Sequence, residues 1–237
     1  MINLIIENKE LLKIFYALVV GLICAVIVLK THRLFRLSHH QGIRYFRNAF
    51  LFYGIAFIVR YFLGAPFLYN SMSGDIFSLI NFIFEYFLIM AGFFLLYSLL
   101  WKKIEGTKRN YSSSLFNLRI LPFYVMAGII VILDLLWNTR EFMFFSQIIL
   151  FAFAVIISYI NYKKKGEKHR FLRFYVVAMI LSFLAWISNT IAALYLKWHP
   201  LVLMGVYASN ILVFLLFLYG VIKVTKNGKE KGKVEHN

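Results

Sequence analysis

Cysteine, proline and acidic residues are scarce in this sequence, and each scarcity removes possibilities. The single cysteine, Cys24, lies inside an apolar run, so the chain forms no intramolecular disulfide and no metal site built from cysteines. None of the three prolines, Pro66, Pro122 and Pro200, interrupts the middle of an apolar run, as happens in the broken helices of many transporters. Asp and Glu number 10 against 26 Lys and Arg, so the chain is strongly basic, with a formal net charge of +16.

Catalytic and metal-binding motifs are also missing. The sequence has no HExxH pattern, no paired aspartates on adjacent apolar segments and no serine with a histidine at membrane depth. His39 and His40 lack the spacing and the companions of a metal site. We therefore predict no catalytic residue, no metal site and no cofactor.

Hydrophobic residues dominate what remains. They make up 62% of the 237 residues, mean hydropathy is +0.75, and only 15% of residues are charged, which is far from the composition of a soluble domain. Apolar runs of about 20 residues, the length that crosses a bilayer as a helix, lie at approximately 11–30, 46–64, 76–100, 118–137, 141–162, 171–196 and 200–223. We predict an all-α integral membrane protein in which residues 1–224 form one domain of seven transmembrane helices and residues 225–237 form a short basic cytoplasmic tail.

The distribution of positive charge predicts the orientation. Most Lys and Arg residues lie in four segments, 30–47, 102–119, 163–173 and 223–237. The exceptions are Lys9, Lys13, Arg60, Arg140 and Lys197. Because cytoplasmic loops carry the excess of positive charge, the amino terminus is predicted outside and the carboxyl terminus inside, in a multi-pass protein of the cell membrane. Positive charge confined to short gaps between spans argues against nucleic-acid binding.

The run 76–100 holds the clearest candidate for function, the carboxylate of Glu85. A charge at that depth costs on the order of 3 kcal/mol on insertion scales, so it faces a protein interior or a water-filled cavity and has a partner. Ser78, Asn81 and Gly92 share its helical face, because they are spaced three, four and seven residues apart along it. The sequence therefore predicts a polar site on this face.

Helical rise places further polar side chains in the outer half of the bundle. The estimated depths below the outer boundary are roughly 6 Å for Arg60, 5 Å for Asp134, 9 Å for Gln147, 12 Å for Asn189, and 14 Å for Glu85 and Asn210. The inner half of the same segments is nearly all apolar. We predict an outward-facing pocket for a ligand or ion, formed by Glu85, Asn81, Arg60, Asp134, Gln147, Asn189 and Asn210. Arg60 is predicted to be the counter-ion of an outer carboxylate.

Four interpretations of this pocket remain open. Its side chains could simply tie helices together through hydrogen bonds of about 0.6 to 2 kcal/mol each. Among functional roles, the sequence favours a receptor or sensor that binds a ligand and acts through a cytoplasmic partner. The alternatives are a small-solute, ion or proton-coupled transporter or channel in which Glu85 carries a proton or cation, and an intramembrane enzyme.

The first cytoplasmic segment is a candidate docking surface. Arg33, Arg36, His40, Arg44 and Arg47 would fall within about 80° of arc if the segment were one helix. Such a stripe would bind anionic lipids on the cytoplasmic face or an acidic protein partner. The positive-inside rule accounts for the same residues without a specific partner.

In topology alone, the arrangement resembles the seven-helix modules that precede output domains in some prokaryotic sensor proteins. No motif supports transfer of a functional residue from those proteins to this chain. Because the sequence has no output domain after its helices, the resemblance implies a separate cytoplasmic partner.

Overall fold

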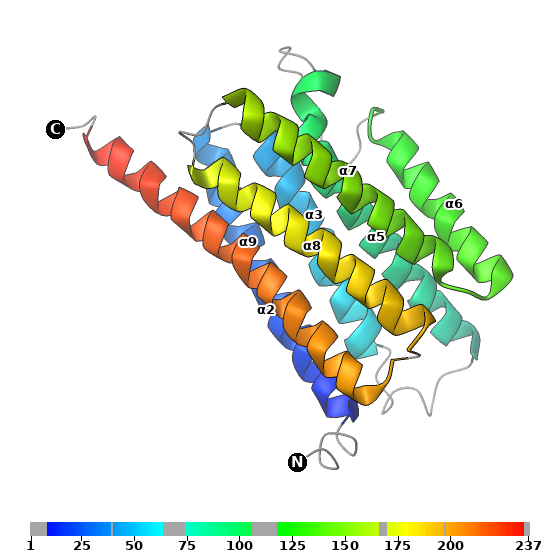
Figure 1. Ribbon diagram of the computed structural model, residues 1–237. Coiled ribbons are helices and arrows are strands. Elements are labelled where there is room, and N and C mark those ends of the chain that lie inside the picture. The colour runs from blue at the N-terminus through cyan, green and yellow to red at the C-terminus, as the bar shows by residue number, and fades with distance from the viewer. Residues whose placement is uncertain are drawn as a thin grey trace.

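The computed structural model describes residues 9–38, 40–63, 74–105, 118–165, 170–196 and 198–234, and within them the chain is helical, with no strand. Its α-helices are α2 (Lys9–Ser38), α3 (Gln41–Ile58), α5 (Gly74–Glu105), α6 (Leu121–Trp137), α7 (Glu141–Lys165), α8 (Arg170–Leu194) and α9 (Pro200–Val234) (Figure 1). A π-helical turn, η1 (Val59–Leu63), continues α3.

Six of these helices are long and apolar enough to cross a bilayer, and α6 is a shorter apolar helix of 17 residues. The prediction of an all-helical, multi-pass membrane protein is therefore confirmed at this level. A seventh span in α6, the outer amino terminus and the cell membrane as location stay predictions.

Several helices extend beyond the apolar runs that predicted them. α2 continues to Ser38, and α9 continues to Val234, where a short tail was predicted from residue 225. Lys and Arg are good helix formers whose long side chains reach water, so basic flanks prolong a helix past the apolar run. α6 differs, because it begins at Leu121 instead of residue 118, with Pro122 in its first turn. The sequence also predicts an outer loop from Pro66 through the polar run at residues 70–75; residues 64–73 lie outside the described residues, whereas Gly74 and Asp75 belong to α5.

Six helices form a closed ring. In order around it they are α2, α3, α5, α7, α8 and α9, and α9 packs back against α2 (Figure 1). α6 packs outside this ring, against α5 and α7. Aromatic side chains fill much of the interior. The Phe50 ring on α3, for example, meets Phe214 and Phe217 on α9 edge to face, with centroids 6.0 and 5.2 Å apart.

The two ends of the ring differ in chemistry. At the Arg140 end, α3 with η1, α6 and α8 finish, and α5, α7 and α9 begin. At the Trp101 end the directions are reversed, and exposed cations gather there, among them Arg33, Arg36, Lys163 and Lys164. The positive-inside rule assigns such an end to the cytoplasm, so the predicted orientation puts the Arg140 end outside.

Candidate functional site

A cavity of about 570 Å³ occupies the interior of the ring. All six ring helices and η1 line it, whereas none of its lining residues belongs to α6. Its wall is largely aromatic. The charged and other polar side chains that line it are Lys13, Tyr16, Tyr53, Arg60, Tyr61, Arg140, Ser182, Asn189, Tyr207 and Asn210.

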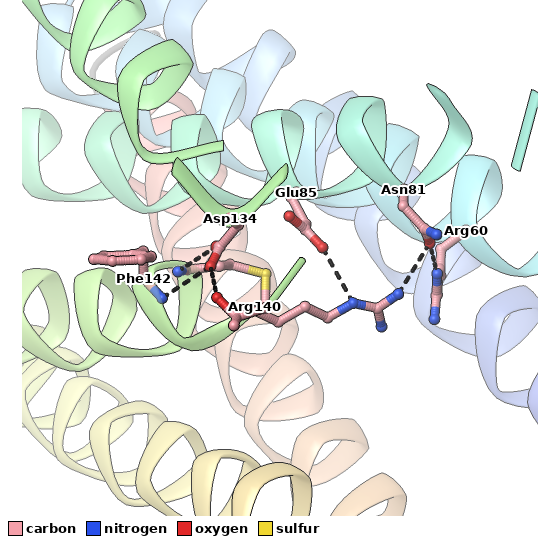
Figure 2. Close-up of polar contacts among 8 residues, drawn as sticks. Arg60, Asn81, Glu85, Asp134, Arg140 and Phe142 are labelled. Carbon is pink, nitrogen blue, oxygen red and sulfur yellow. Dashed lines mark hydrogen bonds and ion pairs between the residues drawn. The ribbon is translucent and has the colours of Figure 1, made fainter. Parts of the chain in front are cut away.

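An ion pair lies at the Arg140 end of this cavity. Arg140 directs its Nε to Glu85 Oε1 at 3.3 Å, from the residue before α7 to the neighbouring helix α5 (Figure 2). The Glu85 side chain is 7% exposed and that of Arg140 is 36% exposed. Glu85 thus pairs with Arg140, because α5 and α7 are direct neighbours in the ring and bring Arg140 beside the carboxylate. That Arg60 is the counter-ion of an outer carboxylate stays a prediction.

The Asn81 side chain joins the two arginines. Its Oδ1 accepts a hydrogen bond from Arg140 Nη2 at 3.2 Å and another from Arg60 Nη1 (Figure 2). The Arg60 guanidinium also lies over the Phe84 ring, 5.4 Å from its centroid. A guanidinium carries five N–H donors, so both arginines keep donors beyond the bonds they make among the described residues. Two positive groups therefore converge on one neutral acceptor.

The π-helical turn η1 positions Arg60 and its neighbour Tyr61. In a regular α-helix, consecutive side chains point about 100° apart, yet both of these line the cavity. The wider turn changes the direction of the residues that follow it, as π-helical insertions commonly do at functional sites. The Tyr61 ring stacks on Phe57 at 6.0 Å and meets the edge of Tyr16 at 5.8 Å. These rings fix the wall beside Arg60.

Asp134 binds the amino-terminal end of α7. Its Oδ1 accepts from the Thr139 hydroxyl at 3.2 Å and from the Phe142 amide at 3.1 Å, and its Oδ2 accepts from the Met143 amide at 2.8 Å (Figure 2). The carboxylate thus binds otherwise unpaired N–H groups in the first turn of α7, where the helix dipole favours negative charge. Asn138, with a φ of 49°, makes the turn that brings α6 back to α7. This arrangement caps α7.

Three amide side chains connect helices. Gln147 Nε2 on α7 donates to the Leu88 carbonyl of α5 at 3.2 Å, next to Gly92, where a Cβ would lie 2.9 Å from Gln147 Oε1. Asn189 on α8 and Asn210 on α9 exchange two hydrogen bonds of 3.1 and 3.2 Å. The Asn pair lines the cavity, whereas Gln147 does not.

The predicted pocket residues thus fall into two groups. Those that line the cavity are Arg60, Asn189 and Asn210. Those that do not are Glu85, Asn81, Asp134 and Gln147. Among the described residues, the charged residues of the lining are therefore cations, namely Lys13, Arg60 and Arg140. Within the described part of the chain, no three His, Cys, Asp or Glu side chains lie together in a way that could hold a metal ion.

Sequence reasoning missed Arg140, which it treated only as one of the few outer positive charges. Its position was readable in part, because Arg140 follows the short turn after Asp134, so both charges had to lie at the same end of adjacent helices. The aromatic lining residues Trp186, Trp198 and Tyr207 were not predictable, since nothing in their spacing separates a cavity wall from a packed core.

The predicted basic stripe is divided in two. α2 ends and α3 begins on either side of residues 39–40, where His40 has an extended backbone. Arg33 and Arg36 therefore lie at the end of α2, while Arg44 and Arg47 lie in the first turns of α3. Arg47 Nη1 is 2.8 Å from His32 Nδ1, which links the two helices. The five residues therefore do not lie along one helix, as the predicted stripe required. Binding of lipids or of a partner by these residues stays a proposal.

A second cavity, of about 320 Å³, lies at the Trp101 end. The Trp101 ring meets His40 edge to face at 4.8 Å in its wall. Phe217 lines both cavities, and its ring lies 6.0 Å from Phe46 and 6.3 Å from Tyr175. Together with Phe50, these rings form an aromatic cluster, here called the Phe217 cluster, between the two cavities.

Comparison with known proteins gives a similarity to a protein without an assigned activity. No family model matches the sequence. The chain is similar to a protein of Archaeoglobus fulgidus that is named an uncharacterized protein, with 27% identity over 221 residues, which cover 88% of this chain and 90% of that protein. Since that name assigns no activity, the function has to be argued from the site itself.

Proposed function

We propose that this protein is a receptor-like or sensor-like membrane protein whose central cavity binds a ligand that carries an anionic group. The observation that supports this is the charge of the lining, which among the described residues comes from the cations Lys13, Arg60 and Arg140. The Glu85 carboxylate is directed to Arg140, and the Asp134 carboxylate is directed to the first turn of α7. Among the side chains that the structure describes, Arg140 forms the ion pair with Glu85, and Arg60 donates to the neutral oxygen of Asn81.

The energetics favour an anion at this place. Arg60 and Arg140 carry like charges, and the Asn81 oxygen that both of them bind is neutral. The guanidinium fork matches carboxylate, phosphate and sulfonate groups, because it donates two parallel hydrogen bonds. A ligand anion between Arg60 and Arg140 would place a negative charge beside both guanidinium groups.

Such a ligand would also couple the site to the opposite end. Arg60 belongs to η1, the continuation of α3, and Arg140 precedes α7, and these two helices lie on opposite sides of α5 in the ring. A ligand held by both arginines connects helices that are not neighbours, so its binding favours one arrangement of their Trp101 ends. Arg33, Arg36, His40, Arg44 and Arg47 are the residues through which a cytoplasmic partner or anionic lipids would detect that arrangement.

Transport of the same anion is a second candidate, because Phe217 lines both cavities. Movement of the Phe217 cluster would join them into one path along the bundle. Proton carriage by Glu85 has less support, since that carboxylate is paired with Arg140 and does not line the cavity. No arrangement of the described side chains supports the third alternative, an intramembrane enzyme.

The test compares three probes that differ only in the charge of the head group: hexanesulfonate, hexanol and hexylamine, added to protein in phosphatidylcholine nanodiscs. Hexanesulfonate should raise the thermal stability and the other two should not, because ligand binding stabilises the folded state. Arg60→Gln or Arg140→Gln should weaken sulfonate binding about tenfold or more, since a hydrogen bond to a charged group contributes about 1.5–3 kcal/mol. Arg36→Gln, at the exposed Trp101 end, is the control. Equal stabilisation by hexanol would refute the proposal.

A flux measurement distinguishes the receptor-like function from anion transport. Proteoliposomes that accumulate labelled hexanesulfonate, with loss of uptake in Arg60→Gln, would establish the transporter. Binding without uptake supports the receptor-like function.

A further inference from the structure

The main cavity is elongated along the helix axes. Its lining residues on α9 extend from Leu203 to Phe217, a distance of about 21 Å at the helical rise, and those on α5 extend from Phe77 to Leu95, about 27 Å. Spread over that length, a volume of about 570 Å³ describes a cavity that is much longer than it is wide, which is the shape of an extended hydrocarbon chain.

The chemistry of the lining changes along this length. Lys13, Arg60 and Arg140 lie at the Arg140 end. The lining toward the Trp101 end is apolar for the most part, with Phe50, Leu95, Phe151, Val213, Phe214 and Phe217. Such a cavity has a charged end and a hydrocarbon end, as an amphiphile has.

The polar groups in the apolar part are few. The Ser182 hydroxyl donates to the Ala178 carbonyl of its own helix at 2.7 Å, so its hydrogen-bonding capacity is used locally. The buried Tyr53 hydroxyl makes no hydrogen bond among the described residues. A ligand that filled this part with polar groups would find almost no partners for them, whereas a methylene chain needs none.

We infer that the ligand of this cavity is a single-chain amphiphile with an anionic head group, held with its head at Arg60 and Arg140 and its chain directed toward the Phe217 cluster. This inference rests on the proposed anion site and adds the chemical class of the rest of the ligand. An extended chain advances about 1.25 Å per carbon, so about 21 Å accommodates roughly 16 carbons. The aromatic rings around Tyr16 and Tyr207 would also suit a quaternary ammonium head, but the neighbouring arginines repel a cation.

If the Phe217 cluster closes one end of the cavity, binding should depend on the length of the ligand's hydrocarbon chain. Partition into a bilayer strengthens with every added methylene, by about fourfold relative to water. Binding in a closed cavity, measured at equal mole fraction in the membrane, instead reaches a maximum when the chain fills the space. We expect occupancy to rise from hexanesulfonate to about hexadecanesulfonate and to fall at least tenfold at docosanesulfonate.

Two matched variants test where the chain lies. Ser182→Phe fills the cavity from α8, and because a phenyl ring spans about 5 Å, it should shorten the preferred chain by about four carbons. Ser188→Phe places the same group on the exposed face of the same helix and should change nothing. If Ser182→Phe does not fold, Ser182→Leu is the replacement, with a smaller shift.

Tryptophan quenching in the unmodified sequence gives an independent position. Trp198 follows the end of α8 at the Arg140 end, and Trp186 lies about 12 Å from the end of that helix, and both line the cavity. Bromine next to the sulfonate should quench Trp198, a signal that Trp198→Phe removes. Bromine in the middle of the chain should quench Trp186, a signal that Trp186→Phe removes.

The outcomes separate this inference from the proposed function. A length maximum that moves in Ser182→Phe but not in Ser188→Phe, with the expected quenching, supports the inference. Sulfonate binding that depends on Arg60 but is indifferent to chain length overturns it and leaves the anion site intact. Hexadecanol binding as strongly as hexadecanesulfonate, with the length maximum retained, overturns the anion site instead. Affinity that increases through docosanesulfonate overturns the closed cavity.

Discussion

Removing Arg140 should destabilise the protein much more than removing Glu85, although both belong to one ion pair. Arg140→Gln leaves a carboxylate that is only 7% exposed without its countercharge, and an uncompensated buried charge costs about 3–5 kcal/mol. Glu85→Gln leaves a guanidinium that is 36% exposed and has a long stem with which to reach water, so that loss should be about 1 kcal/mol. We expect the double variant to lose no more than about 2 kcal/mol.

The appropriate assay is the free energy of unfolding by steric trapping in bicelles, which avoids an anionic detergent that would occupy the proposed site. The four proteins of the double-mutant cycle should give a coupling energy of at least about 2 kcal/mol between the two side chains. Equal losses for the two single variants, adding without coupling, would refute the reasoning.

A second cycle, with Arg60→Gln and Glu85→Gln, is the control. Arg60 binds Asn81, so its effect should add to that of Glu85 within about 0.5 kcal/mol. Stronger coupling to Arg60 than to Arg140 would restore the pairing that the sequence predicted.

Three further predictions concern the helices around the site and their orientation. Asp134→Ala should lower the free energy of unfolding by about 2 kcal/mol without changing ligand affinity, because its carboxylate caps α7 and does not line the cavity. Gly42→Ala should cost about 1–3 kcal/mol, since the new Cβ would lie 2.6 Å from Trp101 Nε1, whereas Gly128→Ala, with open space around it, should be neutral or stabilising when both are unfolded under the same conditions. In a cysteine-free background, Asn210→Cys should react with an impermeant thiol reagent added outside the cell; reaction only from the cytoplasmic side would reverse the predicted orientation.

The helical type of the described residues was predictable, because apolar runs of membrane length leave few alternatives, whereas a seventh span stays a prediction. Their ends were less so: α9 continues through a lysine-rich segment to Val234, since basic residues are compatible with helix outside the apolar layer. The position of α6 outside the ring was not predictable. Helical rise places Asp134 at nearly the same depth as Arg60. It does not show that α6, the helix of Asp134, contributes no residue to the cavity lining.

The ion pair between Glu85 and Arg140 shows that depth estimates from the backbone leave out the length and direction of side chains. Rise per residue placed Glu85 well below Arg140, yet the two side chains meet because an arginine stem extends several ångströms along the helix. Direction also matters: η1 turns Arg60 into the cavity, and no motif in the sequence marks that wider turn. Both effects depend on which helices are neighbours, and that order is a property of packing.

The contact between α2 and α9 closes the ring, and its two helices are synthesised far apart in time. The first and the last of the described helices meet at a stacked pair of rings, Tyr16 and Tyr207, 4.1 Å apart and nearly parallel. A ribosome delivers α9 after the other described helices, so the gap between α2 and α8 stays open until α9 packs there. A chain that terminates before α9 therefore keeps every arginine of the sequence but lacks one wall of the cavity.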